Sequence, residues 1–136
     1  MLKFLNMNEE ITKKKVQVVV IAENSALLLE FNNQKLNNYV GFQNITGEVE
    51  GVESFEVAAL REVVEEIGVD APAVIDLKTE FKFLDRWKKN CFEKVYLCFL
   101  SKKPDIYNPH HQLFLDNINQ SLTVIAESIL GRQVVN

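Results

Sequence analysis

Apolar residues gather in short stretches separated by polar turns, a pattern typical of strands. The stretch VQVVVIA is rich in β-branched residues and predicts a central strand. Asn-rich or Gly-containing segments between the stretches predict loops, and the most polar of these covers residues 32–38. We therefore expect five strands: Val16–Ala22, Ser25–Phe31, Tyr39–Thr46, Ala73–Leu84 and Phe92–Leu100.

Two segments carry helical periodicity instead. The first lies between Ser54, a residue type that caps helix N-termini, and Gly68, which suits a helix C-terminus. The second covers Gln112–Leu130, with apolar residues at helical spacing. Strands around one helix, followed by more strands and a terminal helix, predict an α/β or α+β sandwich. Residues 1–136 are expected to form a single domain.

The first predicted helix has two contrasting sides. At about 100° per residue, one narrow arc is apolar and is expected to be buried; it contains Leu60, Val63, Val64 and Ile67. The opposite arc holds three glutamates that repel one another at i, i+3 and i+4: Glu62, Glu65 and Glu66. A solvated acidic face is one interpretation, and a site for a divalent cation is the other.

Composition narrows the classes of function. Net charge is −4, with 15 basic and 19 acidic residues, which argues against a protein that grips a nucleic-acid duplex by its phosphates. The N-terminal residues are too charged for a signal peptide and the apolar runs too short to span a membrane. Cys91 and Cys98 lack the spacing of a redox or zinc motif, so free thiols and a cytoplasmic location are expected. With only two histidines, any metal must be held mainly by oxygen.

The stretch GEVEGVESFEVAALREVVEEIGV (Gly47–Val69) resembles the Nudix box, G-x5-E-x7-R-E-U-x-E-E-x-G-U with U aliphatic. All nine specified positions match: Gly47, Glu53, Arg61, Glu62, Val63, Glu65, Glu66, Gly68 and Val69. From average residue usage, such a match arises by chance about once in a billion starting positions. The sequence therefore favours a cation site over a solvated acidic face.

The resemblance implies the Nudix fold, a mixed sheet between helices, and hydrolysis of a nucleoside diphosphate linked to another moiety with Mg²⁺ or Mn²⁺. It implies Glu62 and Glu66 as the main metal ligands, with Glu65 assisting and the Gly47 carbonyl completing the set. It also implies that Arg61 pairs with Glu53 to hold the loop against the helix. The catalytic set transferred in this way is Glu62, Glu65, Arg61 and Glu53.

The flanking segments indicate a substrate. GFQNITGEVEGVES resembles the WQxxTGxxExGE segment of dihydroneopterin triphosphate pyrophosphatases, with Phe42 where tryptophan is usual. The stretch FEKVYLCFL resembles their glutamate-bearing strand, here with Glu93. His110 stands where those enzymes carry a further glutamate, which leaves the general base and the substrate open. The positions that mark ADP-ribose and dinucleotide hydrolases hold Leu84 and residues 85–87, so both markers are missing.

The sequence also offers candidates for binding a base and indicates the kind of partner. Tyr39, Phe42 and Trp87 are candidates for stacking a base, with core or rim packing as the alternative for each. The expected partner is a small nucleotide-like phosphate, best a nucleoside or dihydroneopterin triphosphate, and whether the chain forms a homodimer stays open. A nucleotide-binding sensor without catalysis, or a hydrolase of nucleotide sugars or dinucleoside polyphosphates, are the alternative functions.

Overall fold

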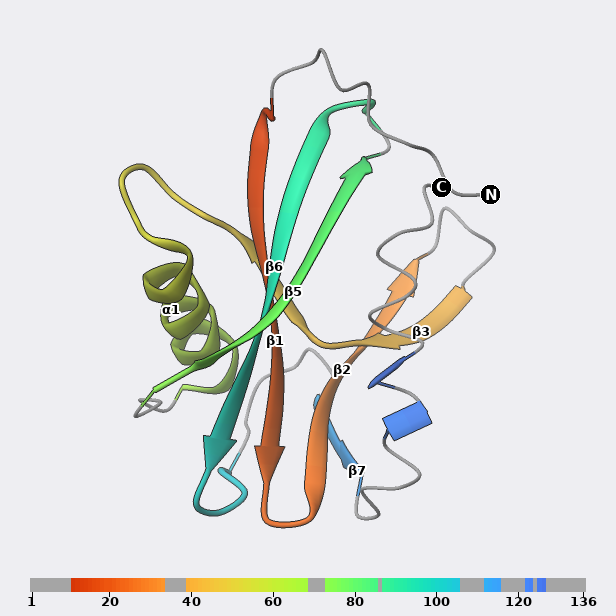
Figure 1. Ribbon diagram of the computed structural model, residues 1–136. Helices are drawn as coiled ribbons and strands as arrows, with labels where there is room; N and C mark the ends of the chain where they lie inside the picture. Colours follow the sequence, from red (N-terminus) through yellow and green to blue (C-terminus); the bar gives the residue numbers. More distant parts are fainter. Residues whose placement is uncertain are drawn as a thin grey trace.

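The computed structural model describes residues 11–33, 39–68, 73–85, 87–105, 112–115, 122–123 and 125–126. Within them lie β1 (Lys13–Ala22), β2 (Ser25–Asn33), β3 (Tyr39–Gln43), β4 (Ile45–Glu48), α1 (Phe55–Ile67), β5 (Ile75–Leu84), β6 (Asn90–Leu100) and β7 (Gln112–Leu115) (Figure 1). The strands form one sheet of order β3-β2-β1-β6-β5, with β4 paired to β1 and β7 to β2. β1 and β6 are parallel and the other pairs antiparallel. The predicted α+β architecture with a mixed sheet is confirmed.

Strand β1 lies at the centre of the sheet and is buried on both faces. Every residue of Val16–Ala22 is buried, which explains why all of them except Gln17 are apolar. Alternate residues of β1 pack beneath α1 in one core cluster, which includes Val16, Val18, Val20, Ala58, Ala59, Val63 and Ile67. Val19 and Ile21 point to the opposite face and pack in a second cluster with Ile125. The sheet therefore has an apolar core on each side.

One edge of β1 is shared by two strands. β2 pairs with β1 only through Val20–Ala22, next to the turn that joins them, and then curves away (Figure 1). β4 occupies the same edge farther along, opposite Lys15–Val18. The strand predicted over Tyr39–Thr46 is therefore broken at Asn44, because β3 stays paired with β2 while β4 pairs with β1. This change of pairing partner places Gly47, the first residue of the Nudix box, beside Val16 of β1.

Helix α1 has the predicted ends. The Ser54 side chain accepts a hydrogen bond from the Val57 N–H at 3.1 Å, which satisfies one of the unpaired donors of the first turn. Gly68 adopts a left-handed conformation at φ 78°, and its N–H donates to the Val64 carbonyl at 2.8 Å. Local sequence chemistry is sufficient to define this helix.

The helix predicted over Gln112–Leu130 is wrong at its start. Gln112–Leu115 forms strand β7 and pairs with Ala26–Leu29 of β2. Backbone groups of β2 require partners along that stretch, and this tertiary demand overrides helical periodicity. Residues 122–123 and 125–126 are helical, and the rest of the predicted helix lies outside the described residues, as do His110 and His111.

Two other predictions can be compared with the structure. Cys91 and Cys98 both lie in β6 as buried free thiols, as expected. Burial raises the pKa of each thiol and keeps it protonated, so neither is an activated nucleophile. In the described ranges, no helix is long and apolar enough to cross a membrane.

Candidate active site

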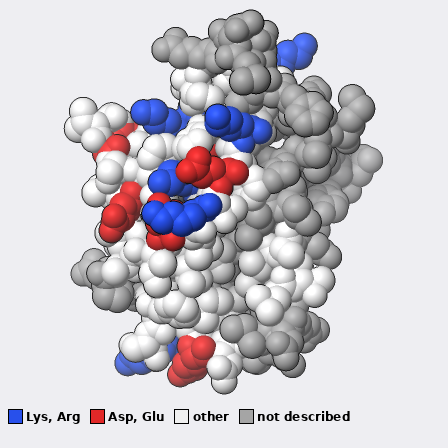
Figure 2. Space-filling model, viewed as in Figure 1, with Lys and Arg blue, Asp and Glu red and all other residues white. Residues whose placement is uncertain are grey.

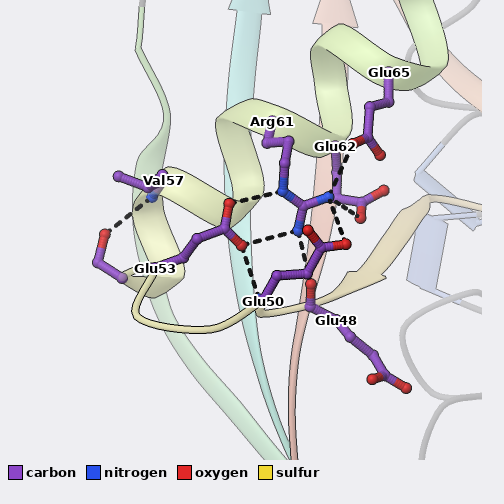
Figure 3. Close-up of polar contacts among 8 residues, drawn as sticks. Glu48, Glu50, Glu53, Val57, Arg61, Glu62 and Glu65 are labelled. Carbon is purple, nitrogen blue, oxygen red and sulfur yellow. Dashed lines mark hydrogen bonds and ion pairs between the residues drawn. The ribbon is translucent and has the colours of Figure 1, made fainter.

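Arg61 is the centre of the candidate site. Its guanidinium lies between the loop after β4 and the second turn of α1, with carboxylates on several sides (Figure 3). Glu53 accepts two hydrogen bonds from it, at 2.7 Å from Nε and 3.0 Å from Nη2. The predicted pairing of Arg61 with Glu53 is thus present in the bidentate geometry that suits arginine. The other contacts are Glu62 Oε1 at 2.9 Å, Glu65 Oε1 at 3.1 Å, the Glu48 carbonyl at 2.8 Å and Glu50 Oε1 at 3.7 Å.

The loop that approaches Arg61 is closed by its own hydrogen bonds. The Glu50 N–H donates to Glu53 Oε1 at 2.8 Å, and the Glu53 N–H donates to the Glu50 carbonyl at 3.0 Å. Hydrogen bonds from Arg61 and from this backbone N–H lower the pKa of Glu53, since both favour the charged carboxylate. Several carboxylates together raise the pKa of Arg61 further above its ordinary value. The loop and helix are therefore joined by a pair whose charged forms stabilise each other.

Glu62 is the carboxylate that the structure buries. The residue is 8% exposed, and its side chain lies directly over Gly47 of β4. A Cβ built on Gly47 would come closer than 3.0 Å to the Glu62 carboxylate, so any larger residue at position 47 displaces it. Glycine is required here for close approach rather than for backbone conformation. Burial is the largest influence on Glu62 and raises its pKa, and the charges of Glu65 and Glu66 act in the same direction.

The buried face of α1 differs from the predicted one. Val63 and Ile67 are buried as expected, but Val64 is 40% exposed and Glu62 lies inside. Small residues at 58 and 59 allow the helix backbone to approach the sheet closely, and this rotates the contact face toward Glu62. Helical periodicity therefore identified most of the inner face, including Leu60, which packs against the core, but it wrongly included Val64 and excluded Glu62.

The donors in this region fit a hard divalent cation. Glu62, Glu65 and Glu66 supply carboxylate oxygens on one helix, and the glycine at position 47 leaves the space in which Glu62 sits. Among the described residues, no three acidic, histidine or cysteine side chains are already grouped around one point, and Glu62 Oε1 faces Arg61. Mg²⁺ commonly takes one or two carboxylates and keeps several waters, so the available oxygens suit it.

The candidate base-binding residues lie on other elements than these carboxylates. Phe42 is 41% exposed in β3, and Trp87 is 62% exposed in the turn between β5 and β6. Lys13 Nζ lies 4.7 Å from the Trp87 ring centroid and 3.7 Å from Glu48, which links that turn to the box. Glu93 is fully buried and accepts a hydrogen bond from Gln17 at 3.1 Å. The Tyr39 side chain lies outside the described part of the structure.

Sequence reasoning missed two residues at or next to this site, and two buried polar residues on the other face of the sheet. Glu48 presents its carbonyl to Arg61, and Lys13 lies between Glu48 and Asp85, 2.9 Å from the latter. Gln17 and Asn44 are polar but fully buried. Their signal was visible in the sequence, because each interrupts a stretch that otherwise predicts a strand.

Comparison with known proteins gives the family. The family model of the NUDIX domain matches residues 12–117, so the chain belongs to the Nudix family. The predicted membership of the Nudix hydrolases and the predicted fold are thereby confirmed. No curated protein matches the chain in sequence.

Solved structures share this fold at low sequence identity. The E. coli dihydroneopterin triphosphate pyrophosphohydrolase has a TM-score of 0.67 at 21% identity, over 91% of this chain and 98% of that one. The E. coli ORF135 protein gives 0.66 at 17%, over 89% and 86% of the two chains. A C. elegans Ap4A hydrolase gives 0.62 at 18%, over 89% and 94%. At such identities the likeness establishes the fold alone.

Replacing Gly47 by alanine should destabilise the protein through Glu62. The added Cβ would overlap the Glu62 side chain, and overpacking of this kind costs about 1–3 kcal/mol. In a Glu62→Ala background the obstruction is gone, so the same change should cost much less. Urea unfolding of the four proteins with chelator present measures this coupling. Equal costs of Gly47→Ala in both backgrounds would contradict the contact.

Glu62→Gln should stabilise the metal-free protein at neutral pH relative to acid pH. Because the pKa of Glu62 is raised on folding, its ionisation opposes folding and stability falls as pH rises through that pKa. The glutamine variant lacks this loss, so its gain over the wild type should be larger at pH 7 than at pH 4. Unfolding curves with chelator test this, with Glu56→Gln in the exposed first turn as control. A gain that does not change with pH would refute the assignment.

Proposed function

We propose that this Nudix protein is a pyrophosphohydrolase that uses Mg²⁺ or Mn²⁺ to cleave a phosphoanhydride bond in a small nucleotide-like substrate. The observation that carries the proposal is the placement of Glu62. A carboxylate held over a glycine, next to two further carboxylates, keeps a raised pKa even with Arg61 2.9 Å away, so a divalent cation would stabilise its charged form. A surface helix without a ligand has no need to bury that charge.

Each box residue has a separate part in this proposal. Glu62 and Glu66 would be the main ligands of the cation, with Glu65 assisting and the Gly47 carbonyl as a further oxygen donor. A bound divalent cation neutralises phosphate oxygens and lowers the pKa of a coordinated water. Arg61 and Glu53 act as positioning residues, since their mutual hydrogen bonds hold the loop against α1. Arg61 also offsets part of the repulsion between Glu62 and Glu65.

For the substrate we propose a triphosphate with a purine-type or pterin base, cleaved to a monophosphate and pyrophosphate. The FQNITG segment supports this choice, and a fold neighbour is a dihydroneopterin triphosphate pyrophosphohydrolase. Exposed Trp87 and Phe42 provide aromatic faces on which a base can stack. On the face seen in Figure 2, basic and acidic side chains of the described residues are intermingled, which favours a small ligand over a nucleic-acid duplex.

Turnover should require a divalent cation and rise toward alkaline pH, where the coordinated water is more readily deprotonated. Glu62→Gln and Glu66→Gln keep side-chain size but remove the charge that holds the cation, so each should lower kcat by orders of magnitude. Glu56→Gln, on the same helix, should leave kcat unchanged. Steady-state kinetics with Mg²⁺, Mn²⁺ or chelator provides the measurement. Turnover that survives thorough chelation would refute the metal assignment.

Triphosphates should be the fastest substrates in a panel that also contains ADP-ribose, nucleotide sugars and dinucleoside polyphosphates, some of which are substrates of fold neighbours by name. Product analysis should show monophosphate and pyrophosphate in equal amounts. Faster turnover of a dinucleotide or sugar nucleotide would refute the substrate while leaving the metal chemistry in place. Tight nucleotide binding with no turnover of any compound would instead indicate a sensor.

A further inference from the structure

Three polar side chains are buried side by side on the sheet face opposite α1. Glu93 of β6, Gln17 of β1 and Asn44, between β3 and β4, all have 0% exposure. Gln17 Nε2 donates to Glu93 Oε1 at 3.1 Å, and Asn44 Nδ2 donates to Gln17 Oε1 at 2.7 Å. Removing such groups from water costs free energy, and their mutual hydrogen bonds offset part of that cost.

The polar chain has a direction that the carboxylate sets. The side chain of Glu93 has no N–H group, and Gln17 turns its amide nitrogen toward Glu93 Oε1. The amide oxygen of Gln17 then points the other way and can accept only from a donor, which is the Asn44 nitrogen. The carboxyl group on β6 therefore orients two amides in succession, across β1 and as far as the residue before β4.

The end of this polar chain coincides with the break between β3 and β4. Asn44 is the residue at which the chain changes its pairing partner from β2 to β1. Gln17 lies directly opposite Thr46 in the register, and Val16 lies opposite Gly47. Gln17 therefore contacts β4 through its pairing with Thr46, and it also binds Asn44, the residue just before β4.

The register of β4 decides which residue lies beneath Glu62. A shift by one residue would reverse the faces of β4 and bring Thr46 or Glu48 to the place of Gly47. Either side chain would enter the space that Glu62 occupies, since not even a Cβ fits there. With only four residues, β4 has few pairs of its own to resist such a shift.

We propose that Glu93, Gln17 and Asn44 form a register lock that holds Gly47 beneath Glu62, which makes all three positioning residues for the carboxylate site. Its effect on turnover rests on the proposed function, whereas its effect on the register does not. Glu93 lies on the sheet face opposite α1, whereas the carboxylates proposed to bind the cation lie on the α1 side.

An exchange of residue types tests the direction of the polar chain. Gln17→Glu places two carboxylates together, and Glu93→Gln replaces an acceptor-only group by an amide that can present either its oxygen or its nitrogen to Gln17, so each should weaken the lock. In the double variant, the amide now at position 93 donates to the carboxylate now at position 17, which also accepts from Asn44. The double variant should therefore recover what the single variants lose. If Gln17→Glu does not fold, Glu93→Gln and the double variant still provide the comparison.

Amide hydrogen exchange of the metal-free protein reports how firmly β4 is held in its register, and it does not depend on an activity assay. Glu93→Gln should speed amide exchange in β4 about tenfold relative to β2 and β5. Val95→Ala, opposite Gln17 on β6, removes core packing but no member of the polar chain, and should not single out β4. Titration calorimetry with Mn²⁺ alone should show binding weakened about tenfold in Glu93→Gln and restored in the double variant.

The outcomes separate the lock from the proposed function. Recovery of β4 protection in the double variant supports the lock, even if no triphosphate is turned over. Single variants that lower the melting temperature but leave β4 exchange and Mn²⁺ binding like those of Val95→Ala would show ordinary packing and overturn it. A double variant no better than its single parents would also overturn it, because the direction of the polar chain would then be irrelevant.

Discussion

The candidate site depends on one guanidinium among glutamates. Arg61 is the cation that contacts Glu53, Glu62 and Glu65 in this region, and it also binds the Glu48 carbonyl. Like charges at this density would push the loop and the helix apart, and the fixed planar fork of arginine contacts both at once. A lysine offers a single charged point and could not replace this geometry. The acidic stretch can therefore fold compactly while it keeps carboxylates available for a cation.

The sheet decides where that stretch is placed. β1 is buried on both faces and pairs with β6 along its whole length, so it cannot shift. Because β2 leaves β1 after a few pairs, an edge of β1 remains open, and β4 fills it. This brings Gly47 against the inner side of α1, where the absence of a side chain admits Glu62. The site is thus a junction between a rigid strand, a short strand and a helix.

Burial of Glu62 shows how core packing and chemistry share one helix. Small side chains at positions 58 and 59 bring α1 close to the sheet, and Val63 packs into the core. Glu62 directly precedes Val63 on the same helix. Its burial raises its pKa, and its ionisation therefore opposes folding. The protein accepts this unfavourable term where a cation would reverse it, which is how functional sites differ from an optimised core.

Local interactions were readable from the sequence, and long-range ones were not. The ends of α1 and most strands follow from capping and apolar spacing within short segments, and the resemblance to the Nudix box implied the pairing of Arg61 with Glu53. The strand at Gln112–Leu115, the break at Asn44 and the burial of Glu62 were decided by the tertiary structure. Each of these depends on a partner distant in the chain: an unpaired stretch of β2, an open edge of β1, and a glycine on another strand. Hydrophobic periodicity reports which residues avoid water, but only the assembled sheet determines which backbone and which space they meet.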